Sequence, residues 1–256
     1  MQRSSRVDYD AIAELYDSTP HREKSADPEL IAFCSVRGPA ASLTLLDIAC
    51  GTGNQQIANR DLAPDARFVG LDGSLGMLRQ ARRKMPDIAW VHGDSAALPF
   101  ESGSFDFISC QYAFHHFRDK AGMLREAFRV LRRRGRFALY NLCPQESEGW
   151  LYHAYFPEAK TRDFADFWPP DGIVSEMTAT GFAGVEVKRR HVHRERDLAE
   201  LLSAVRFRER NSQLLSLSDA AYAAGLRRIE GDLVDPRTPK VRADHLCFVT
   251  VRGDRG

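Results

Sequence analysis

Acidic residues and glycines recur at spaced points in the first half of the chain. Asp47 lies at the end of an apolar run, and Gly51 and Gly53 follow it in the stretch LLDIACGTGNQQIA. Asp72 comes nineteen positions after Gly53, and Asp94 ends a later apolar segment. Glycines let a backbone turn tightly and approach a ligand, and a carboxylate can accept from both hydroxyls of a ribose. The turn contains no basic side chain, so it suits a cationic or zwitterionic ligand better than a pyrophosphate.

A dinucleotide-binding turn is the competing interpretation of the same residues. It requires G-x-G-x-x-G, and the third glycine position, counted from Gly51, holds Gln56, whose side chain would obstruct close packing of helix on strand. Asp72 fits either an NAD-like or another adenosine ligand, and an acid at Asp94 can accept from an adenine amine. A simpler alternative is that Asp72 only faces the positive end of the helix that follows it.

The elements that would position these residues alternate between strands and helices. Apolar runs predict strands at 43–49, 67–72, 88–94, 104–110, 135–142, 184–192 and 244–252, and helical patterns predict helices at 74–85, 119–131, 171–182, 196–207 and 216–233. Strands separated by helices imply right-handed crossovers and a parallel sheet. We therefore expect an α/β doubly wound fold, whose ligand binds beyond the carboxyl ends of the strands, beside the first strand.

Four stretches resemble, in order, the motifs of class I S-adenosylmethionine-dependent methyltransferases. They are LLDIACGTGN, FVGLDGSLGML, GDSAALPFESGSFDFISCQYAFHHF and LREAFRVLRRRGRFALYN, within residues 43–141. The branch they are most similar to includes the ubiquinone and menaquinone biosynthesis methyltransferases. The resemblance implies a Rossmann-like, doubly wound seven-stranded sheet of order 3-2-1-4-5-7-6, S-adenosyl-L-methionine as cofactor, and methyl transfer to a small-molecule acceptor.

The resemblance also implies which residues hold the cofactor. The methionine part is assigned to Asp47, Ala49, Gly51 and Gly53, with Gln111 nearby; the ribose to Asp72, Gly73 and Met77; the adenine to Asp94 and Ser95; and a covering ring to Tyr16, with Tyr9 second. Plain packing of an amphipathic N-terminal helix is the alternative for both tyrosines. The sequence departs from the family pattern at Ala49, where the first glycine of the turn is usual, and at Arg133-Arg134-Gly135, where Pro-Gly-Gly is usual. We expect the basic run to be a solvated turn.

Two adjacent histidines are the candidates for catalysis. A sulfonium carries its own leaving group, so the enzyme must chiefly align the acceptor and exclude water. An acceptor that carries a proton can also require a base. His115 and His116 follow the fourth predicted strand, and one of them would act as the base or orient the acceptor. The alternative is that His116 only ties down its loop.

The segments outside the shared motifs bear on the acceptor. Seven of the nineteen residues between 150 and 168 are aromatic, against 10% of the whole chain. They would either enclose an apolar or planar acceptor or pin an insertion to the core. We expect one domain over 1–256, with an N-terminal lid at 1–40, a cofactor-binding core at 41–143, an aromatic-rich insertion at 144–170 and a helical cap at 194–240.

Composition limits the other possibilities. The net charge of +1 indicates no bulk attraction to nucleic acid. The sequence contains no apolar run long enough to predict insertion into a membrane. The five cysteines are scattered without a CxxC pair, which favours the cytoplasm and argues against a metal site. We expect a monomer or homodimer. The alternatives are a methyltransferase of RNA or protein, a nicotinamide-dependent oxidoreductase, and an inactive cofactor-binding partner protein.

Overall fold

The computed structural model describes residues 7–18, 23–37 and 43–256, which form two compact units. Unit 1 comprises the described residues of Met1–Asn141, Pro170–Lys188 and Thr250–Gly256, and unit 2 comprises Leu142–Pro169 and Arg189–Val249. The predicted insertion at 144–170 and cap at 194–240 fall almost wholly in unit 2. The boundary predicted between residues 40 and 41 lies outside the described residues, and the single domain stays a prediction.

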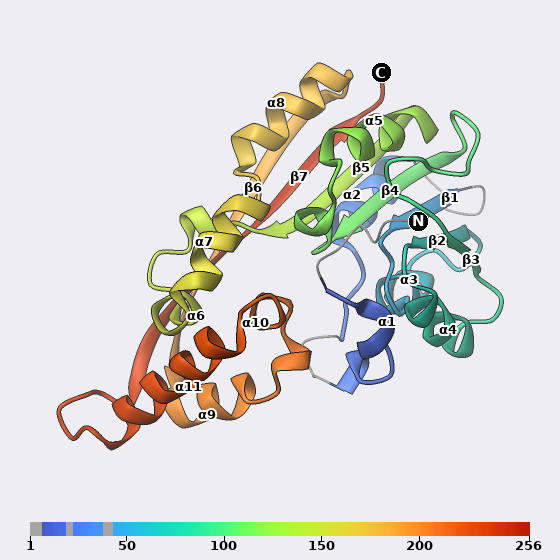
Figure 1. Ribbon diagram of the computed structural model, residues 1–256. Coiled ribbons are helices and arrows are strands. Elements are labelled where there is room, and N and C mark those ends of the chain that lie inside the picture. Colours follow the sequence, from blue (N-terminus) through green and yellow to red (C-terminus); the bar gives the residue numbers. More distant parts are fainter. Residues whose placement is uncertain (1–6, 19–22, 38–42) are drawn as a thin grey trace. The chain divides into compact units, whose positions relative to one another are not determined.

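A seven-stranded sheet has the order β3-β2-β1-β4-β5-β7-β6, which confirms the expected topology (Figure 1). The strands are β1 (Thr44–Ile48), β2 (Arg67–Asp72), β3 (Ala89–His92), β4 (Phe105–Gln111), β5 (Leu131–Leu142), β6 (Ala183–Asp197) and β7 (Val241–Asp254). The pairs β2–β3, β1–β2, β1–β4 and β4–β5 are parallel. The ends of β1, β2 and β4 therefore meet at one edge of the sheet, where the predicted ligand residues follow them.

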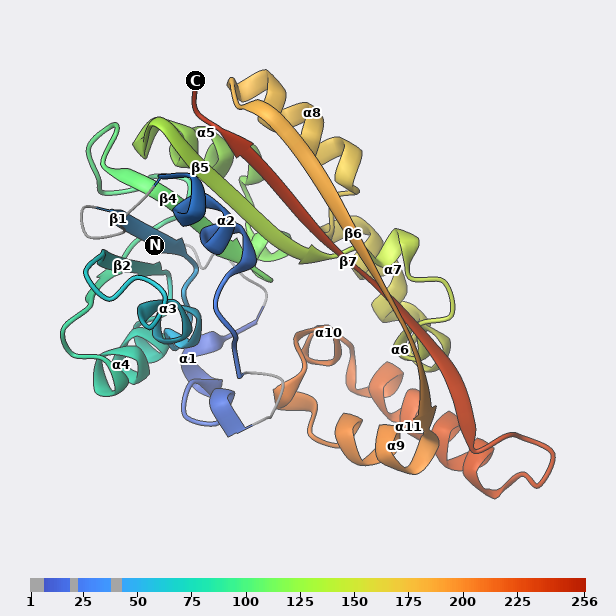
Figure 2. The same cartoon turned by 180° about the vertical axis from the view of Figure 1, so that it is seen from behind.

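The helices of unit 1 cover both faces of its strands. They are α1 (Tyr9–Ile12), η1 (Tyr16–Ser18), α2 (Pro28–Arg37), α3 (Asn54–Arg60), α4 (Leu75–Lys84), η4 (Phe114–His116), α5 (Lys120–Val130) and α8 (Pro170–Thr180). Leu30 and Phe33 of α2 join a buried cluster with Phe107 of β4. The helices α5 and α8 lie on the opposite face from α2 (Figures 1 and 2). Within the predicted lid, α2 is thus part of the buried core. The short helices α1 and η1 contain no buried residues and are the part that can serve as a lid.

The local signals read from the sequence explain how several elements begin and end. The Ser74 hydroxyl accepts from the Met77 amide 3.1 Å away and caps α4 as predicted. Gly181 ends α8 with φ of 111°, a conformation that favours glycine. The main difference concerns β5, which starts at Leu131 instead of 135. The run Arg133-Arg134-Gly135 is therefore part of the strand and lies at a register shift, with Arg134 at φ of 63°.

Unit 2 combines short helices with the remaining parts of β6 and β7. Its helical segments are η5 (Pro144–Glu146), α6 (Leu151–Tyr155), α7 (Pro157–Asp166), α9 (Leu198–Val205), η6 (Arg208–Arg210), α10 (Ser212–Leu215) and α11 (Asp219–Val234). Buried Trp150, Tyr155 and Phe156 form one cluster with Leu198 and Leu201 of α9. Most rings of the aromatic segment are therefore core residues of unit 2, which favours the second of the two interpretations given for them. None of the described helices is long and apolar enough to cross a bilayer.

Candidate active site

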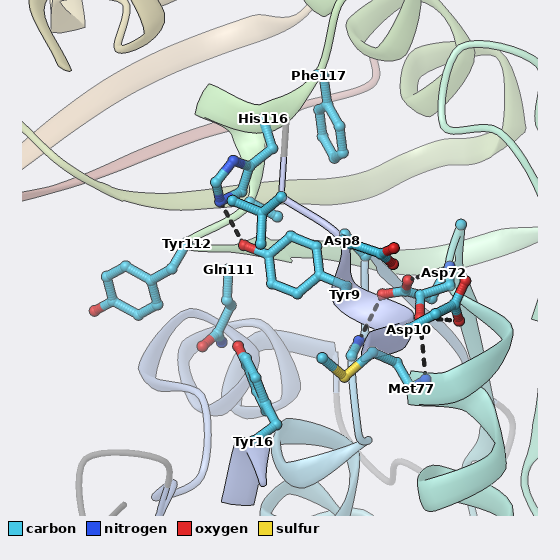
Figure 3. Close-up of a pocket in the computed structure, with 16 residues that line it drawn as sticks. Asp8, Tyr9, Asp10, Tyr16, Asp72, Met77, Gln111, Tyr112, His116 and Phe117 are labelled. Carbon is cyan, nitrogen blue, oxygen red and sulfur yellow. Dashed lines mark hydrogen bonds between the residues drawn. The ribbon is translucent and has the colours of Figure 1, made fainter. Parts of the chain in front are cut away.

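A pocket in unit 1 lies at the carboxyl ends of β1, β2 and β4, and the N-terminal segment forms part of its wall (Figure 3). Seven of the eleven predicted cofactor residues line it, namely Tyr16, Ala49, Gly51, Asp72, Gly73, Met77 and Gln111. His116 lines it as well. The structure thus brings together residues from four separate segments that the sequence analysis assigned to one ligand.

The turn after β1 uses left-handed backbone three times. Ala49, Gly51 and Gly53 have φ of 57°, 56° and 80°. Such angles are strained for any residue with a Cβ atom, so Ala49 holds an unfavourable conformation where the family pattern has glycine. A Cβ atom at Gly51 would lie 4.0 Å from the ring of Tyr16. The Tyr16 ring therefore lies directly over this turn.

Asp72 joins the turn after β1 to the helix after β2. Its Oδ2 accepts from the Gly51 amide and its Oδ1 from the Ser74 amide, both at 2.8 Å. Burial raises the pKa of the Asp72 carboxyl above its ordinary value, and these two amides act in the opposite direction. Each carboxylate oxygen can accept a second hydrogen bond, so Asp72 can hold this turn and still accept from a ribose.

Four predicted cofactor residues do not line this pocket: Asp47, Gly53, Asp94 and Ser95. Asp47 is buried and accepts from the Ser109 hydroxyl at 2.7 Å, and burial raises the pKa of Asp47 to about 7. Asp94 accepts from the Ala96 amide at 2.9 Å in the turn after β3. Their roles toward the adenine and methionine parts stay predictions.

Gly53 makes room for an indole ring. A Cβ atom at Gly53 would lie 2.5 Å from Cη2 of Trp90, and one at Gly70 would lie 2.5 Å from Cε3 of the same ring. The Trp90 side chain is fixed by its own donation to the Met85 carbonyl at 2.8 Å. The second glycine of the turn is thus required for packing against β3.

Two acids of the N-terminal segment hold it against the core, and the sequence analysis did not single them out. Oδ1 of Asp10 accepts from the Ser74 hydroxyl at 2.8 Å and from the Gly76 amide at 2.5 Å, at the start of α4. Asp17 accepts from the Thr52 hydroxyl at 2.7 Å and pairs with Lys84 at 2.7 Å. The sequence feature that could have identified them is an acidic residue near each end of the stretch YDAIAELYD. These contacts place α1 and η1 over the pocket.

The pocket lining is acidic and aromatic. Its carboxylates belong to Asp8, Asp10 and Asp72, and none of the sixteen described residues that line it is Lys or Arg. Its rings include those of Tyr9, Tyr16, Tyr112, Phe117 and His116. Carboxylates and ring faces both attract cations. The lining therefore fits a ligand that carries positive charge and a ribose, such as an adenosyl sulfonium.

The two candidate histidines differ in position. Nε2 of His116 lies 2.7 Å from the Tyr9 hydroxyl, at the pocket wall (Figure 3). Burial lowers the pKa of His116 to about 4, so its ring is neutral near pH 7. His115 does not line the pocket, and its Nδ1 donates to Oδ1 of Asn141 at 3.2 Å. Burial also lowers the pKa of His115.

Gln111 is oriented by a buried acid from the N-terminal part of the chain. Its side-chain amide donates to Oδ2 of Asp27 at 3.3 Å, and the Tyr140 hydroxyl donates to the other oxygen of Asp27. Asp27 is 1% exposed and also caps the start of α2 by accepting from the Glu29 amide at 2.8 Å. Burial raises the pKa of Asp27. An Asp directly before Pro28 is a local signal for the helix cap. Nothing local marks the contact with Gln111, because the partners of Asp27 in the pocket wall come from β4 and β5.

Gln56 separates the two coenzyme classes weighed from the sequence. It is 2% exposed, and its side chain donates to the Val69 carbonyl of β2 at 2.8 Å. A hydrogen-bonded side chain therefore occupies the place where a dinucleotide-binding turn has its third glycine.

Comparisons with known proteins identify the family of the chain. A methyltransferase domain family matches residues 46–139. The demethylmenaquinone methyltransferase of Thermotoga maritima is 32% identical over 160 residues, which cover 54% of this chain and 69% of that protein. The enzyme of the same name from Thermus thermophilus is 35% identical over 118 residues, 44% of this chain and 54% of that protein. The chain thus spans about half to two thirds of the length of these curated relatives.

Solved structures share the fold at low sequence identity. The phosphoethanolamine N-methyltransferase 2 of Haemonchus contortus, in complex with S-adenosyl-L-methionine, has a TM-score of 0.61 and 18% identity over 96% of this chain and 57% of that one. The YcgJ protein of Bacillus subtilis has a TM-score of 0.57 and 19% identity, over 89% of this chain and 96% of that one.

Fold, pocket and relatives define the class of this protein: the chain belongs to the class I S-adenosylmethionine-dependent methyltransferases. Its curated relatives place it in the menaquinone- and ubiquinone-like branch of that class. It is a methyltransferase, and S-adenosyl-L-methionine is its cofactor. The resemblance read from the four sequence motifs is thereby confirmed, and the nicotinamide-dependent alternative is wrong.

Proposed function

We propose that this methyltransferase acts on a small, planar and largely apolar acceptor with a ring hydroxyl, of the quinol or phenol kind, by in-line displacement. The observation that carries the proposal is the pocket itself, in which the His116–Tyr9 pair and the rings of Tyr112 and Phe117 line the same space as the cofactor residues. Aromatic walls favour planar apolar ligands. The names of the curated relatives, demethylmenaquinone methyltransferases, support the same class of acceptor.

The proposed cofactor contacts follow the lining of the pocket. The backbone at Ala49 and Gly51 would receive the methionine part, with Gln111 beside it, and Asp72 would accept from the ribose hydroxyls with Gly73 and Met77 nearby. Four residues outside the described lining keep their predicted parts in the proposal: Asp47 and Gly53 toward the methionine part, and Asp94 and Ser95 toward the adenine. Tyr16 is proposed for the cover. When bound, S-adenosyl-L-methionine supplies an electrophilic methyl carbon and a neutral thioether leaving group.

The chain's own residues would contribute alignment and a place for one proton. A bond forms between the acceptor and the methyl carbon as the sulfur–carbon bond breaks, and the acceptor loses its hydroxyl or ring proton. Neutral His116, in its hydrogen bond with Tyr9, can orient the group that bears that proton. Because a pKa of about 4 makes His116 a weak base, it would take up the proton only as the methyl group is transferred, when the acceptor proton becomes strongly acidic. His115, whose ring centroid lies 3.9 Å from that of His116, would hold the His116 ring in position.

The proposed setting follows from composition. The net charge of +1 and the five cysteine thiols suit a cytoplasmic enzyme that acts without nucleic acid. We propose a monomer or homodimer, which light scattering of the purified chain distinguishes.

Ligand-dependent melting tests the cofactor assignment, and turnover tests the acceptor. A micromolar ligand at millimolar concentration stabilises a protein by roughly 4 kcal/mol, so S-adenosylmethionine and S-adenosylhomocysteine should raise the Tm while NADH should not. Release of S-adenosylhomocysteine is then measured with a naphthoquinol, a simple phenol, bulk RNA and bulk protein. Methylation of the two ring acceptors alone supports the proposal. Methylation of RNA or protein contradicts it, and binding without turnover on any acceptor identifies a binding-only relative.

A double-mutant cycle tests the histidine–tyrosine pair. His116→Gln and Tyr9→Phe should each lower kcat while leaving the affinity for S-adenosylhomocysteine within about twofold. Because the two groups share one hydrogen bond, the double variant should be little slower than the slower single variant. Additive losses, or unchanged turnover in His116→Gln, would remove the pair from the reaction.

A further inference from the structure

Three side chains with metal-binding atoms meet in unit 2, apart from the pocket. Glu146 ends η5, His191 lies on β6 and Cys247 lies on β7. A carboxylate oxygen, an imidazole nitrogen and the thiol sulfur all lie within 4.8 Å of one another. Sγ of Cys247 is 3.8 Å from Oε2 of Glu146 and 4.0 Å from Nε2 of His191. No residue of the proposed methyl transfer takes part.

Backbone contacts hold the three segments in place. The Cys143 amide donates to the Cys247 carbonyl at 2.9 Å, which joins the end of β5 to β7. The Ser147 hydroxyl donates to the Cys143 carbonyl at 2.7 Å and accepts from the Cys247 amide at 2.9 Å. Ser147 is 4% exposed, so this link is shielded from water. The residue before it, Glu146, is thereby fixed beside Cys247.

A chain of two imidazoles sets which nitrogen of His191 carries a proton. Nδ1 of His245 lies 3.0 Å from the Glu148 carbonyl, which can only accept, so this nitrogen carries the hydrogen. The other nitrogen of neutral His245, Nε2, must then accept from Nδ1 of His191 at 3.0 Å. In the neutral form of His191, Nε2 then has the lone pair, 4.0 Å from Sγ of Cys247. This is the tautomer and the outer support that a metal-binding histidine requires.

We propose that Glu146, His191 and Cys247 bind one divalent cation of the Zn²⁺ class. One thiolate, one imidazole and one carboxylate form a ligand set of intermediate softness, which suits Zn²⁺ or Co²⁺ and not Mg²⁺ or Ca²⁺. Tetrahedral zinc with ordinary bond lengths requires about 3.5 Å between sulfur and either nitrogen or oxygen. The observed 3.8 and 4.0 Å from the sulfur therefore need only a few tenths of an ångström of contraction. The carboxylate oxygen and the imidazole nitrogen lie within 4.8 Å of each other and would also approach when the ion binds. Three protein ligands leave the fourth position to water.

Access and charge are compatible with reversible binding. His191 is exposed, Glu146 is half-buried and Cys247 is buried, so the ion would enter from the His191 side. Arg189 pairs with the Glu146 carboxylate, its Nε lying 3.1 and 3.0 Å from the two oxygens. The ion would share this carboxylate with Arg189, and loss of the thiol proton would offset half of the added charge. The site departs from the expectation of no metal because its ligands come from three distant segments and need no CxxC pair.

Metal binding by the full chain, measured without methyl acceptor, tests the proposal. The chain is stripped with a chelator and titrated with Zn²⁺ against a chromophoric competitor, and Co²⁺ is used as a spectroscopic probe. We expect one ion per chain and a thiolate-to-Co²⁺ charge-transfer band. His191→Gln and Cys247→Ser should each weaken Zn²⁺ binding by more than about 100-fold, because even the loss of an outer support costs 10–100-fold. His245→Phe should weaken it by about 10–100-fold.

Matched controls separate ligand loss from misfolding. Cys34→Ser removes a thiol in unit 1, and His193→Gln removes a ring that stacks on His245 at 4.1 Å but is outside the ligand set; both should bind Zn²⁺ as the parent chain does. S-adenosylhomocysteine binding by every variant reports that unit 1 remains folded. Absence of a stoichiometric ion, a Co²⁺ spectrum without the charge-transfer band, or equal losses in the control variants would overturn the proposal, whatever the outcome for methyl transfer.

Discussion

Replacing Asp72 by asparagine separates its two roles, and the structure gives the size of each effect. Both carboxylate oxygens accept backbone amides at 2.8 Å. Asparagine keeps one acceptor and presents an NH₂ group to the other amide, so one hydrogen bond to a charged group is lost, worth about 1.5–3 kcal/mol. Burial of a charged carboxylate costs free energy, which is why the pKa of Asp72 is raised. The neutral asparagine avoids this cost, so part of the loss is offset. We expect unfolding free energy to fall by about 1–2 kcal/mol.

The loss of cofactor affinity should be larger than the loss of stability. A carboxylate that accepts from two ribose hydroxyls contributes more than an amide that accepts from one, and a difference of about 2–3 kcal/mol corresponds to roughly 30- to 150-fold in Kd. Calorimetric titration with S-adenosylhomocysteine and urea unfolding measure the two quantities on one preparation. Asp87→Asn, at an exposed ion pair with Arg60, is the matched control and should change neither by more than about 0.5 kcal/mol. An Asp72→Asn variant with parental affinity and lowered stability would refute the ribose assignment and leave a purely structural carboxylate.

Three further predictions concern the turn after β1 and the acid before it. Ala49→Gly removes left-handed backbone strain of about 1–2 kcal/mol, and the greater entropy of the unfolded chain costs about 0.4–1 kcal/mol. The Tm should therefore rise slightly without loss of cofactor binding. A lower Tm would contradict the strained geometry of Ala49. Gly53→Ala should destabilise by about 2–5 kcal/mol, from the same strain and from overlap with Trp90, and a Tm close to the parent's would show that the ring moves aside. The folded state holds the Asp47 proton up to about pH 7 while the unfolded state loses it near 3.8. Stability should therefore fall as the pH rises from about 4 to about 7, by at most about 1.4 kcal/mol per pH unit for this group, and Asp47→Asn should flatten that slope in urea titrations.

The parts of the fold that follow from local patterns were predictable. The limits of β2 depend on apolar periodicity, and the Ser74 cap depends on one side chain beside a helix end. The strand order was predictable only through the resemblance to the methyltransferase family. The sequence analysis predicted a turn at 133–135 before a strand at 135–142, whereas β5 begins at Leu131. The reason is a register shift, which lets Arg134 take a left-handed conformation inside the strand. A pattern of residue types contains no information on where two strands change register.

Residues that act through distant partners were not predictable in the same way. The many aromatic residues in 150–168 are compatible both with a wall around a substrate and with a hydrophobic core. Only the burial of the rings distinguishes these two functions, and Phe156, for example, is 1% exposed. Asp10, Asp17 and Asp27 gain their roles from partners far along the chain. Glu146, His191 and Cys247 are far apart in the sequence, so no short motif could have predicted that they form a cluster.

The electrostatics of the described pocket lining favour a cationic ligand over a pyrophosphate. Asp72 and Asp10 are held by amides at helix starts and by the Ser74 hydroxyl. Partial positive charges of such amides stabilise a carboxylate without competing for it as a Lys ammonium would. An entering sulfonium or ammonium therefore meets negative charge that is already oriented. A pyrophosphate would instead face the carboxylates of Asp8, Asp10 and Asp72, and the lining residues that the structure describes include no Lys or Arg.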